Sequence, residues 1–277
     1  MVRAQAPRIL VLAALVLVVH NVHAQVSSGS GAPATHDADA LAKELSNPVS
    51  TLISVPFQEN LDFAVGQTDG WRSTLNVQPV YPVSLDSTWN MINRVILPIT
   101  YQDNVVDSQS DFGLGDTTVE IFFSPKAKTS GGLIWGVGPA LLLPTATKDA
   151  LGGEKWGAGP TALVLKQEGL LTYGLLVNHI WSLAGTGTRN EISSTFIQPF
   201  YAYGAGHGRT FTVNLESTYD WKADQWTIPV NIVASQVLKL GSQLASVGIG
   251  GRYYVEAPAN GPEWGIRLFV TLMFPEH

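Results

Sequence analysis

The stretch Gly265-Ile266-Arg267-Leu268-Phe269-Val270-Thr271-Leu272-Met273-Phe274 lies near the end of a chain of 277 residues and decides how the rest of it is interpreted. Its residues alternate between an apolar row, which ends at Leu272 and Phe274, and a second row that contains Arg267. A period of two predicts a β-strand. In a soluble sandwich the apolar row would be buried and Arg267 would face water. In a membrane barrel the same row would face lipid and Arg267 a wet lumen.

The N-terminus has the pattern of a secretory signal peptide. Arg3 and Arg8 precede an apolar run over 9–19, and Ala24 is a small residue at the expected cleavage site. The run is too short to remain as a membrane-spanning helix, which needs ~20 apolar residues. We therefore predict a signal peptide over 1–24 and an exported mature chain.

The composition of the mature chain excludes several classes of protein. Without the two arginines of the signal peptide, 14 basic residues remain against 22 acidic ones, a net charge of about −8 that argues against a nucleic-acid partner. The chain has no cysteine, so no disulfide framework holds it together. No later stretch is long enough for a transmembrane helix, so any residence in a membrane must use strands.

The region 25–48 precedes the strands and divides into two parts. Residues 25–35 are rich in Ser and Gly and are typical of a flexible linker. Residues 38–45 predict a short amphipathic helix, because Ala38, Leu41 and Leu45 share one face and Asn47-Pro48 ends it. A helix of this length is not stable alone in water, so we expect it to lean on the mouth or the lumen of a barrel.

From residue 49 onward the chain predicts a closed antiparallel transmembrane β-barrel over 49–277. Twelve stretches alternate between apolar and polar residues, an even number, and each has about the ~9–11 residues that a tilted strand needs to cross a bilayer. The predicted strands are 51–62, 73–82, 88–100, 116–124, 133–144, 156–168, 170–182, 193–203, 210–220, 226–237, 243–255 and 265–274.

The connections and the tryptophans favour a membrane barrel over a soluble sandwich. The outer connections, such as 63–72 and 101–115, are longer than the inner ones except at 221–225, which is the pattern of outer-membrane barrels. All eight Trp lie at or next to a predicted strand end, as in the aromatic girdles of such barrels. We place Trp71, Trp156, Trp181, Trp221, Trp226 and Trp264 at the outer rim, and Trp89 and Trp135 at the inner rim.

Polar side chains occupy the row opposite the apolar one, and we expect them to line the pore. A soluble barrel would have to bury five charged side chains among them, which is costly without matched partners. Charged side chains that line a pore set its selectivity, or they pair across the lumen and brace it. We weigh these two roles equally. The predicted pore-lining residues are Arg94, Glu120, Glu216, Arg252, Arg267, Asn76, Gln78, Asn214 and Asn231.

Several longer runs are similar to those of a known family. They are Leu52-Ile53-Ser54-Val55-Pro56-Phe57-Gln58, Gly113-Leu114-Gly115-Asp116, Trp135-Gly136-Val137-Gly138-Pro139, Leu143-Pro144-Thr145-Ala146-Thr147, Lys155-Trp156-Gly157-Ala158-Gly159-Pro160, Glu216-Ser217-Thr218-Tyr219-Asp220-Trp221 and Gly261-Pro262-Glu263-Trp264-Gly265. Together they resemble the outer-membrane family labelled "MetA-pathway of phenol degradation", some members of which are mislabelled neuromedin U. The resemblance spans roughly residues 41–275.

This resemblance implies a bacterial outer-membrane β-barrel that passes aromatic or other hydrophobic compounds. The family supplies no catalytic or binding residues that carry over to this chain. One departure concerns the C-terminus, because Pro275-Glu276-His277 follow Phe274 where outer-membrane proteins commonly end on an aromatic residue.

Three other patterns each have a structural and a functional interpretation. His179 and Ser182 are the nearest approach to a nucleophile with its base, but a separation of three residues places them on opposite faces of a strand.

Asp103, Asp107 and Asp111 predict a solvated acidic loop rather than a site for a cation that bridges lipopolysaccharide. The bare positions of six glycines predict curvature of the wall rather than space for the helix or for a flat ligand: Gly136, Gly138, Gly157, Gly159, Gly248 and Gly250.

The sequence therefore predicts a passive outer-membrane channel for small, hydrophobic or aromatic compounds, with no catalytic residues, metal or cofactor. We expect it to contact outer-membrane lipid and lipopolysaccharide, to depend on the barrel-assembly machinery, and to bind a small-molecule solute. Twelve strands predict a narrow pore, since eight-stranded barrels are filled and those of 16–18 strands hold an aqueous channel. Two alternatives stay open, an outer-membrane lipid-modifying hydrolase and a structural or adhesive barrel with a closed lumen.

Overall fold

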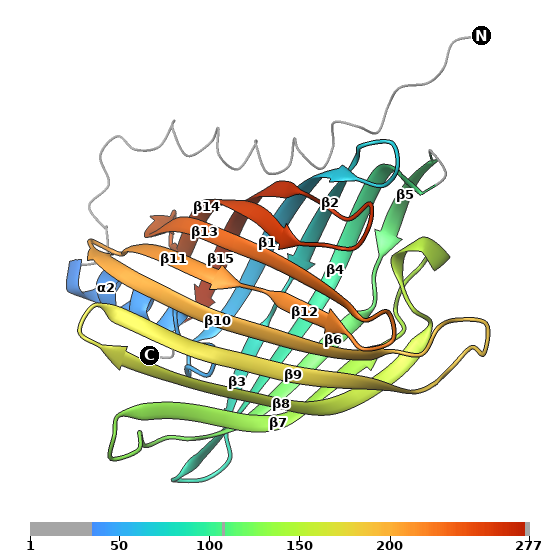
Figure 1. The fold of residues 1–277 in the computed structure, drawn as a ribbon. Coiled ribbons are helices and arrows are strands. Elements are labelled where there is room, and N and C mark those ends of the chain that lie inside the picture. Colours follow the sequence, from blue (N-terminus) through green and yellow to red (C-terminus); the bar gives the residue numbers. More distant parts are fainter. Residues whose placement is uncertain (1–34, 107–108, 275–277) are drawn as a thin grey trace.

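A computed structural model describes residues 35–106 and 109–274 of the chain (Figure 1). The predicted signal peptide, nearly all of the predicted linker and Asp107 lie outside the described residues. One helix, α2 (Thr35–Leu45), precedes the strands and begins three residues before the predicted start. The strands are β1 (Ile53–Val65), β2 (Gly70–Val77), β3 (Val80–Ser84), β4 (Trp89–Val106), β5 (Gln109–Leu114), β6 (Thr117–Pro125), β7 (Leu133–Leu143), β8 (Lys155–Glu168), β9 (Leu171–Gly185), β10 (Ser193–Gly206), β11 (Arg209–Leu215), β12 (Ser217–Asp220), β13 (Gln225–Leu240), β14 (Gln243–Glu256) and β15 (Trp264–Phe274).

The strands form one closed antiparallel sheet, as the sequence predicted. The first strand pairs with the last over eleven residue pairs, from Ile53↔Phe274 to Phe63↔Trp264. β2 with β3, β5 with β6, and β11 with β12 each form one crossing in two segments, so the fifteen segments make twelve crossings. Closure leaves no unpaired sheet edge, which a bilayer would not tolerate. No helix in the described part of the chain is long and apolar enough to cross a membrane.

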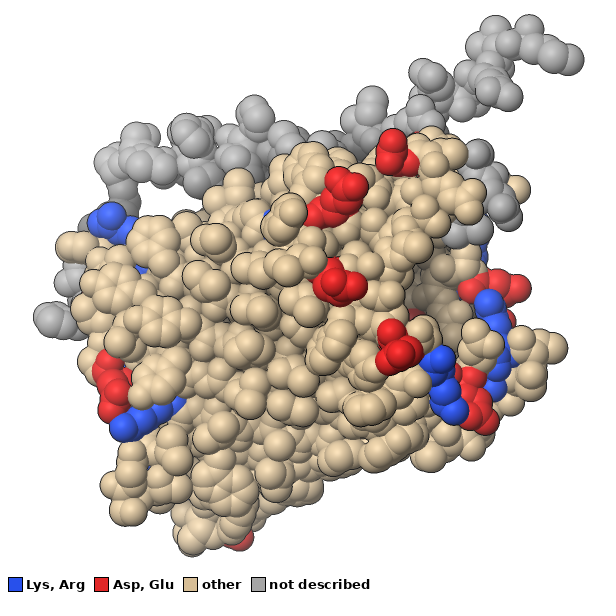
Figure 2. Space-filling view, viewed as in Figure 1, with Lys and Arg blue, Asp and Glu red and all other residues tan. Residues whose placement is uncertain are grey.

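The outward row of each strand is apolar across the middle of the barrel and aromatic near its ends. Ile232 and Ile249 are 63% and 60% exposed on this surface, although both are large aliphatic residues. Five of the six Trp predicted for the outer rim are exposed, and Trp89 packs edge-on against Trp135 at the inner rim. Figure 2 shows the charged side chains gathered toward the two ends of the molecule, with an uncharged band between them. This pattern suits a wall in contact with hydrocarbon.

Two of the predicted outer loops are mostly strand, which corrects the prediction. β1 continues to Val65 and β2 begins at Gly70, so the predicted connection 63–72 shrinks to the turn 66–69. β4 extends to Val106 and pairs with β5, so the predicted loop 101–115 is a β-hairpin that projects beyond the barrel (Figure 1). Backbone pairing past the membrane boundary explains the difference, because pairing does not need an apolar row.

Two predicted strands are interrupted, and each interruption places a polar residue inside the barrel. The stretch 73–82 breaks between β2 and β3, where the amide of Gln78 donates to the carbonyl of Pro56 (2.8 Å). The stretch 210–220 breaks at Glu216, whose amide donates to the carbonyl of Pro229 (3.2 Å). A proline lies beside each break, and since proline cannot donate to a ladder it is found where pairing is irregular.

The helix α2 lies at the end of the barrel that carries its short turns (Figure 1). Short turns face the periplasm in outer-membrane barrels, so we call this the periplasmic end. Ala38 and Ala42 pack against Leu52, Val237 and Met273, which holds the helix to the inside of the wall. Lys43 donates to the carbonyl of Gly169 in the turn between β8 and β9 (3.1 Å). The predicted interaction of the helix with the barrel mouth is confirmed.

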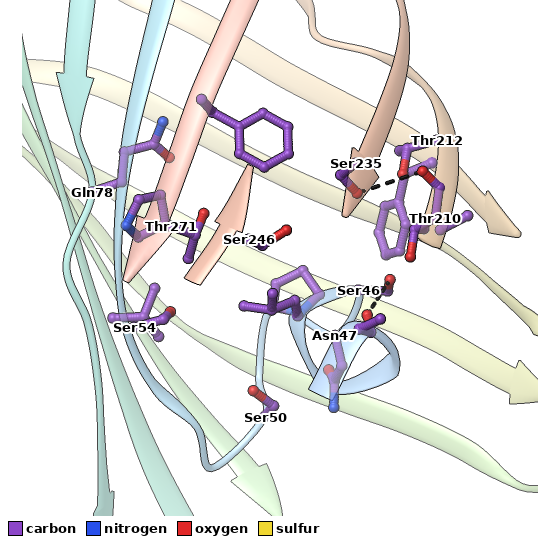
Figure 3. Close-up of a pocket in the computed structure, with 18 of the residues that line it drawn as sticks. Ser46, Asn47, Ser50, Ser54, Gln78, Thr210, Thr212, Ser235, Ser246 and Thr271 are labelled. Atoms are coloured by element: carbon purple, nitrogen blue, oxygen red, sulfur yellow. Dashed lines mark hydrogen bonds between the residues drawn. The ribbon is translucent and has the colours of Figure 1, made fainter. Parts of the chain in front are cut away.

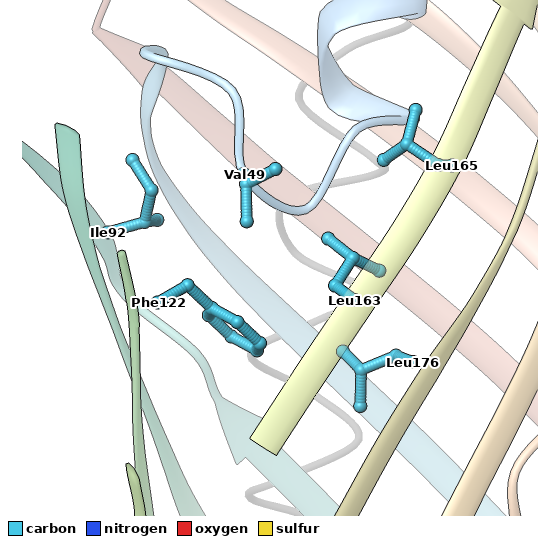
Figure 4. Close-up of a cluster of buried hydrophobic side chains, with 6 residues drawn as sticks. All are labelled: Val49, Ile92, Phe122, Leu163, Leu165 and Leu176. Atoms are coloured by element: carbon cyan, nitrogen blue, oxygen red, sulfur yellow. The ribbon is translucent and has the colours of Figure 1, made fainter. Parts of the chain in front are cut away.

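The lumen is not polar throughout, contrary to the prediction. Near the periplasmic end, four strands turn large apolar side chains inward, and the connection between α2 and β1 adds Val49 to them (Figure 4). The members of this cluster, which we call the lumenal apolar cluster, are Val49, Ile92, Phe122, Leu163, Leu165 and Leu176. The alternation along β4 and β6 has no charge at positions 92 and 122, so the polar row is interrupted there.

Candidate functional site

The lumen holds a cavity of about 260 Å³ at its periplasmic end (Figure 3). Hydroxyl and amide side chains from several strands point into it, together with Phe200, Phe269 and the segment between α2 and β1. Its labelled lining residues are Ser46, Asn47, Ser50, Ser54, Gln78, Thr210, Thr212, Ser235, Ser246 and Thr271. A cavity of 150 Å³ is enough to bind benzene, so this one has room for a single substituted ring.

Arg94 lies at the inner boundary of this cavity and anchors one half of a charged network. Its guanidinium donates to Gln78 Oε1 (2.8 Å) and to Glu120 Oε2 (3.2 Å). Glu120 is almost wholly buried, and its other oxygen accepts from the amide of Asn178 (2.9 Å) and the hydroxyl of Thr161 (3.4 Å). The carboxylate is therefore compensated by one cation and two neutral donors, as a buried charge requires.

Glu216 and Arg267 anchor the other half of the network. The guanidinium of Arg267 donates two hydrogen bonds of 2.7 Å to the two oxygens of Glu216, and its Nε donates to Asn60 Oδ1 (2.8 Å). The interruption of the strand at Glu216 gives its side chain the reach to meet β15. Such a bidentate pair fixes both side chains in position. Arg94 interacts electrostatically with Glu216, which connects the two halves across the lumen.

Toward the outer end, Arg252 and Tyr254 extend the network to Asp62. Arg252 donates to the hydroxyl of Tyr254 (2.8 Å), which donates to Asp62 Oδ1 (3.0 Å). The Nε of Arg252 lies 3.5 Å from the same carboxylate oxygen. Arg72, opposite Asp62 on β2, has a buried Nε with no hydrogen-bond partner in the described part of the chain.

The charged network separates two cavities along the barrel axis. Beyond Tyr254 and Arg72 lies an outer cavity of about 600 Å³, which the turn 66–69 and the connection 258–262 also line. Three arginines and three carboxylates are linked in the network: Arg94, Arg252, Arg267, Asp62, Glu120 and Glu216. Arg72, opposite Asp62 on β2, adds a fourth positive charge beside them, so with Arg72 the network has an excess of one positive charge. A solute that crosses the barrel must pass this constriction.

The structure brings the predicted pore-lining residues together in this region. Arg94, Glu120, Gln78, Glu216, Arg252 and Arg267 belong to the network. Asn231 donates to Asn214 (2.8 Å), and Asn76 lies opposite Gln58 on the inward face of β2. The roles of these residues in selecting a solute stay a prediction. Asn231 is fully buried, and its carbonyl oxygen has no partner among the described residues, so an internal water would satisfy it.

The sequence analysis missed six residues that the structure places in or beside the network: Asn60, Asp62, Arg72, Thr161, Asn178 and Tyr254. Asp62 ends a predicted strand and Arg72 lies in a predicted loop, although Asp62 has the parity of Asn60 on the polar row. Tyr254 lies near the end of the predicted strand 243–255, and Asn178 has apolar neighbours in the sequence. The alternation of residues is enough to place Asp62 on the inward row. Arg72 could not be placed there, because the predicted strand begins at residue 73 whereas β2 begins at Gly70.

His179 and Ser182 are not hydrogen-bonded to each other, in accord with their predicted opposite faces. The hydroxyl of Ser182 accepts from the amide of Ile192 (3.0 Å), whereas the His179 ring lies against Trp181. The structure instead places Ser193, from the neighbouring strand, 3.4 Å from His179 Nε2. A hydroxyl, Thr195 Oγ1, contacts Nδ1 (2.7 Å). In a serine hydrolase triad a carboxylate occupies that position and stabilises the imidazolium.

The acidic residues of the predicted outer loop diverge. Ser110 donates to Asp103 Oδ1 (2.6 Å), whereas Asp111 accepts from Lys148 (3.1 Å), which lies in the connection between β7 and β8. Within the described residues, no three His, Cys, Asp or Glu side chains gather as metal ligands would.

The glycines of the two Trp-Gly-x-Gly-Pro runs serve two purposes. A Cβ at Gly138 would lie 1.9 Å from the carbonyl oxygen of Ile121, and one at Gly159 would lie 1.8 Å from that of His179. Neighbouring backbones therefore approach each other closely there, which supports the predicted role in wall curvature. Gly136 differs, because a Cβ there would lie 3.4 Å from a methyl group of Val49. Its bare position leaves room for Val49 rather than for the helix.

Comparisons with known proteins agree with this architecture. An outer-membrane channel from Pseudomonas putida F1 superposes with a TM-score of 0.61 at 17% identity, over 80% of this chain and 94% of that one. The NanC porin gives 0.46 at 12% identity, over 81% of this chain and 100% of the porin. The KdgM porin, solved with disordered oligogalacturonate, gives 0.45 at 10% identity, over 81% and 100%. No family model matches the chain, and no curated protein matches it.

The fold is that of a bacterial outer-membrane barrel. This finding rests on the similarity to the Pseudomonas channel and agrees with the predicted fold. The phenol-degradation label suggested by the sequence runs is not among the comparisons and stays a prediction.

Proposed function

We propose that this protein is a passive outer-membrane channel for small solutes that carry a ring together with polar groups. The observation that supports it is an outer cavity and an inner cavity inside a closed barrel, with the charged constriction between them. Phe200 and Phe269 offer apolar surfaces in the inner cavity, and the hydroxyl and amide side chains around them offer hydrogen bonds. A concave site with apolar surfaces and a few polar groups is typical of small-molecule binding.

The positive excess of the network favours solutes with a negative charge or a hydrogen-bond acceptor. Arg72 lines the outer cavity and Arg94 lines the inner one, so a positive charge lies at each end of the constriction. The outward rows contact lipid, and at the outer rim lipopolysaccharide. This substrate class agrees with what the resemblance to the phenol-degradation family implies.

Reconstitution in lipid tests the proposal. Purified protein in a planar bilayer is expected to produce discrete current steps, and liposomes that contain it are expected to take up 4-hydroxybenzoate faster than gluconate. Both solutes carry one negative charge, so the difference reports the ring. If the protein inserts but produces no steps and no uptake above empty liposomes, the barrel is closed and the proposal is wrong.

A second candidate is a lipid-modifying hydrolase, because His179 and Ser193 lie together on the outward face near the outer rim. Thr195 in the place of a carboxylate disfavours it, since a hydroxyl does not offset the charge that a general base acquires. Hydrolysis of phospholipid esters by the wild-type protein, compared with Ser193→Ala, decides between the two. A rate that the substitution abolishes would establish the hydrolase.

A further inference from the structure

Val49 occupies a site inside the lumen that resembles the place of a bound ligand. It belongs to the connection between α2 and β1, and it is 5% exposed within the lumenal apolar cluster. Ile92, Phe122, Leu163, Leu165 and Leu176 come from the barrel wall and converge on it from four strands (Figure 4). An inward-facing apolar patch on the wall of an aqueous pore would be exposed to water if Val49 were absent, at a cost proportional to its area.

The wall is shaped around this side chain. A Cβ at Gly136 would lie 3.3 Å from Phe122 Cβ, which is tight, and 3.4 Å from Val49 Cγ1, at van der Waals contact. An alanine would therefore press on Phe122 and fill the space beside Val49, whereas glycine leaves a recess there.

Among the described residues, the connection contacts the wall through apolar side chains and forms no hydrogen bond with it. The hydrogen bonds that the structure gives residues 46–50 run to Ala42, Glu44 and Leu52 or stay among themselves, all within one segment of the chain. The helix before it makes three polar contacts with the barrel, through Asp39 and Lys43. Few polar bonds must break for the segment to move, and the apolar contact is the one that a competing apolar group replaces.

The inner cavity adjoins the same cluster. Val80 and Phe200 line the cavity and also pack against the lumenal apolar cluster, while Pro48 and Ser50, on either side of Val49, line the cavity from the opposite side. A solute in the cavity therefore lies next to the site of Val49 and against the segment that carries it.

Resting on the channel function proposed above, we propose that Val49 is an internal occupant of the binding site for the apolar part of the solute. Residues 46–50 with α2 are a plug at the periplasmic end. A solute with an apolar ring takes the place of Val49 in the lumenal apolar cluster, and the plug moves aside to open the exit.

A reversible cross-link between plug and wall tests this proposal. A Cβ at Gly208 would lie 3.0 Å from that of Ala38, so Ala38→Cys with Gly208→Cys forms a disulfide after a small shift, since Cβ atoms in disulfides are ~3.5–4.5 Å apart. The chain has no other cysteine. The oxidised protein is expected to lose the high-conductance steps in a planar bilayer, and reduction is expected to restore them. The single-cysteine variants should respond to neither treatment, and because Gly208 has a φ of +73°, Gly208→Cys alone is also the control for backbone strain.

Substitutions of Val49 give a second readout that needs no cross-link. Val49→Asp places a carboxylate among apolar side chains and is expected to hold the channel open without a solute. Val49→Leu keeps the apolar contact and is expected to resemble the wild type. Addition of 4-hydroxybenzoate should raise the open fraction of the wild type, whereas gluconate should not.

The outcomes separate this inference from the channel function. Equal conductance of the oxidised and reduced protein, with Val49→Asp like the wild type, would leave the channel but refute the plug. Absence of conductance in the reduced protein and in Val49→Asp would refute both.

Discussion

Glu216 and Arg267 pair inside the lumen through two hydrogen bonds of 2.7 Å, one to each oxygen of the carboxylate. Glu216 lies at the break between β11 and β12, and Arg267 lies on β15. Their side chains are 19% and 3% exposed, so either one alone would leave a charge with little access to water. We expect Arg267→Met to lower the free energy of unfolding by about 3 kcal/mol, as the loss of one partner of a buried pair does. Urea titration in lipid vesicles with tryptophan fluorescence measures it.

Lys222 and Glu191 are the matched control for this experiment. They form an ion pair of similar length, 2.9 Å, but their side chains are 51% and 71% exposed. Lys222→Met should therefore change the free energy of unfolding by less than ~1 kcal/mol. Equal losses in the two variants would show that Glu216 and Arg267 are solvated in the pore rather than buried.

Arg94 is expected to set the ion preference of the constriction. It is the arginine at the boundary of the inner cavity, and the network has a positive excess of one. Arg94→Gln removes that excess, so the reversal potential in a KCl gradient should shift toward cation selectivity. Lys239→Gln, near the end of β13, removes the same charge outside the network and should leave the reversal potential unchanged.

Ile232 tests which surface contacts hydrocarbon. It lies at the middle of β13, is 63% exposed, and alternates with the inward Asn231. Ile232→Lys should destabilise the folded barrel in lipid by about 2–4 kcal/mol, because a lysine at the midplane must lose its hydration. Gln225→Lys, at the end of the same strand, should cost ~1 kcal/mol or less. If Ile232→Lys is tolerated as well as Gln225→Lys, the outward row does not contact lipid.

Glu154 holds together the β7–β8 and β9–β10 connections at the outer end, and we expect this contact to depend on pH. Hydrogen bonds from Thr186 and Arg189 lower the pKa of this carboxyl below its ordinary value of 4.5. Because the pKa is lower in the folded state than in the unfolded state, the ionised carboxylate stabilises this contact at any pH above the ordinary pKa of 4.5. That stabilisation is lost as the pH falls from 4.5 through the lowered pKa. The protection factors of the amides in 186–189 against hydrogen exchange should therefore fall below pH 4.5. Glu154→Gln should remove this pH dependence while leaving exchange in the strands unchanged.

The strands and the charged network could be predicted from the sequence because both follow from a period of two. The row that contains Arg267 faces the lumen in the structure, as its alternation with apolar residues requires. Strand lengths outside the membrane could not be predicted in the same way, so 101–115 was assigned to a loop although it pairs as a hairpin. Backbone pairing there needs no apolar row, and the sequence has no other signal for it.

The lumenal apolar cluster could not be predicted because its members come from distant parts of the chain. Phe122 and Ile92 are apolar residues on the inward row, and in the sequence they look like extensions of the outward row. Their inward position is explained by their common contact with Val49. The sequence does not show this contact, because it depends on where the connection after α2 lies. The glycine at 136 was noticed as a bare position, but its partner was not evident.

Gly136 and Val49 offer a test of packing inside the lumen that does not depend on conductance. Gly136→Ala places a methyl group 3.4 Å from Val49 and 3.3 Å from Phe122, so it should lower the free energy of unfolding by about 1–3 kcal/mol through overpacking. In a Val49→Ala background the new methyl has space, and the cost of Gly136→Ala should fall by at least ~0.5 kcal/mol, a coupling typical of residues in contact. Gly187→Ala is the matched control, because a Cβ there meets no atom within 4 Å. Additive effects of Gly136→Ala and Val49→Ala would mean that Val49 does not rest against this part of the wall in the folded protein.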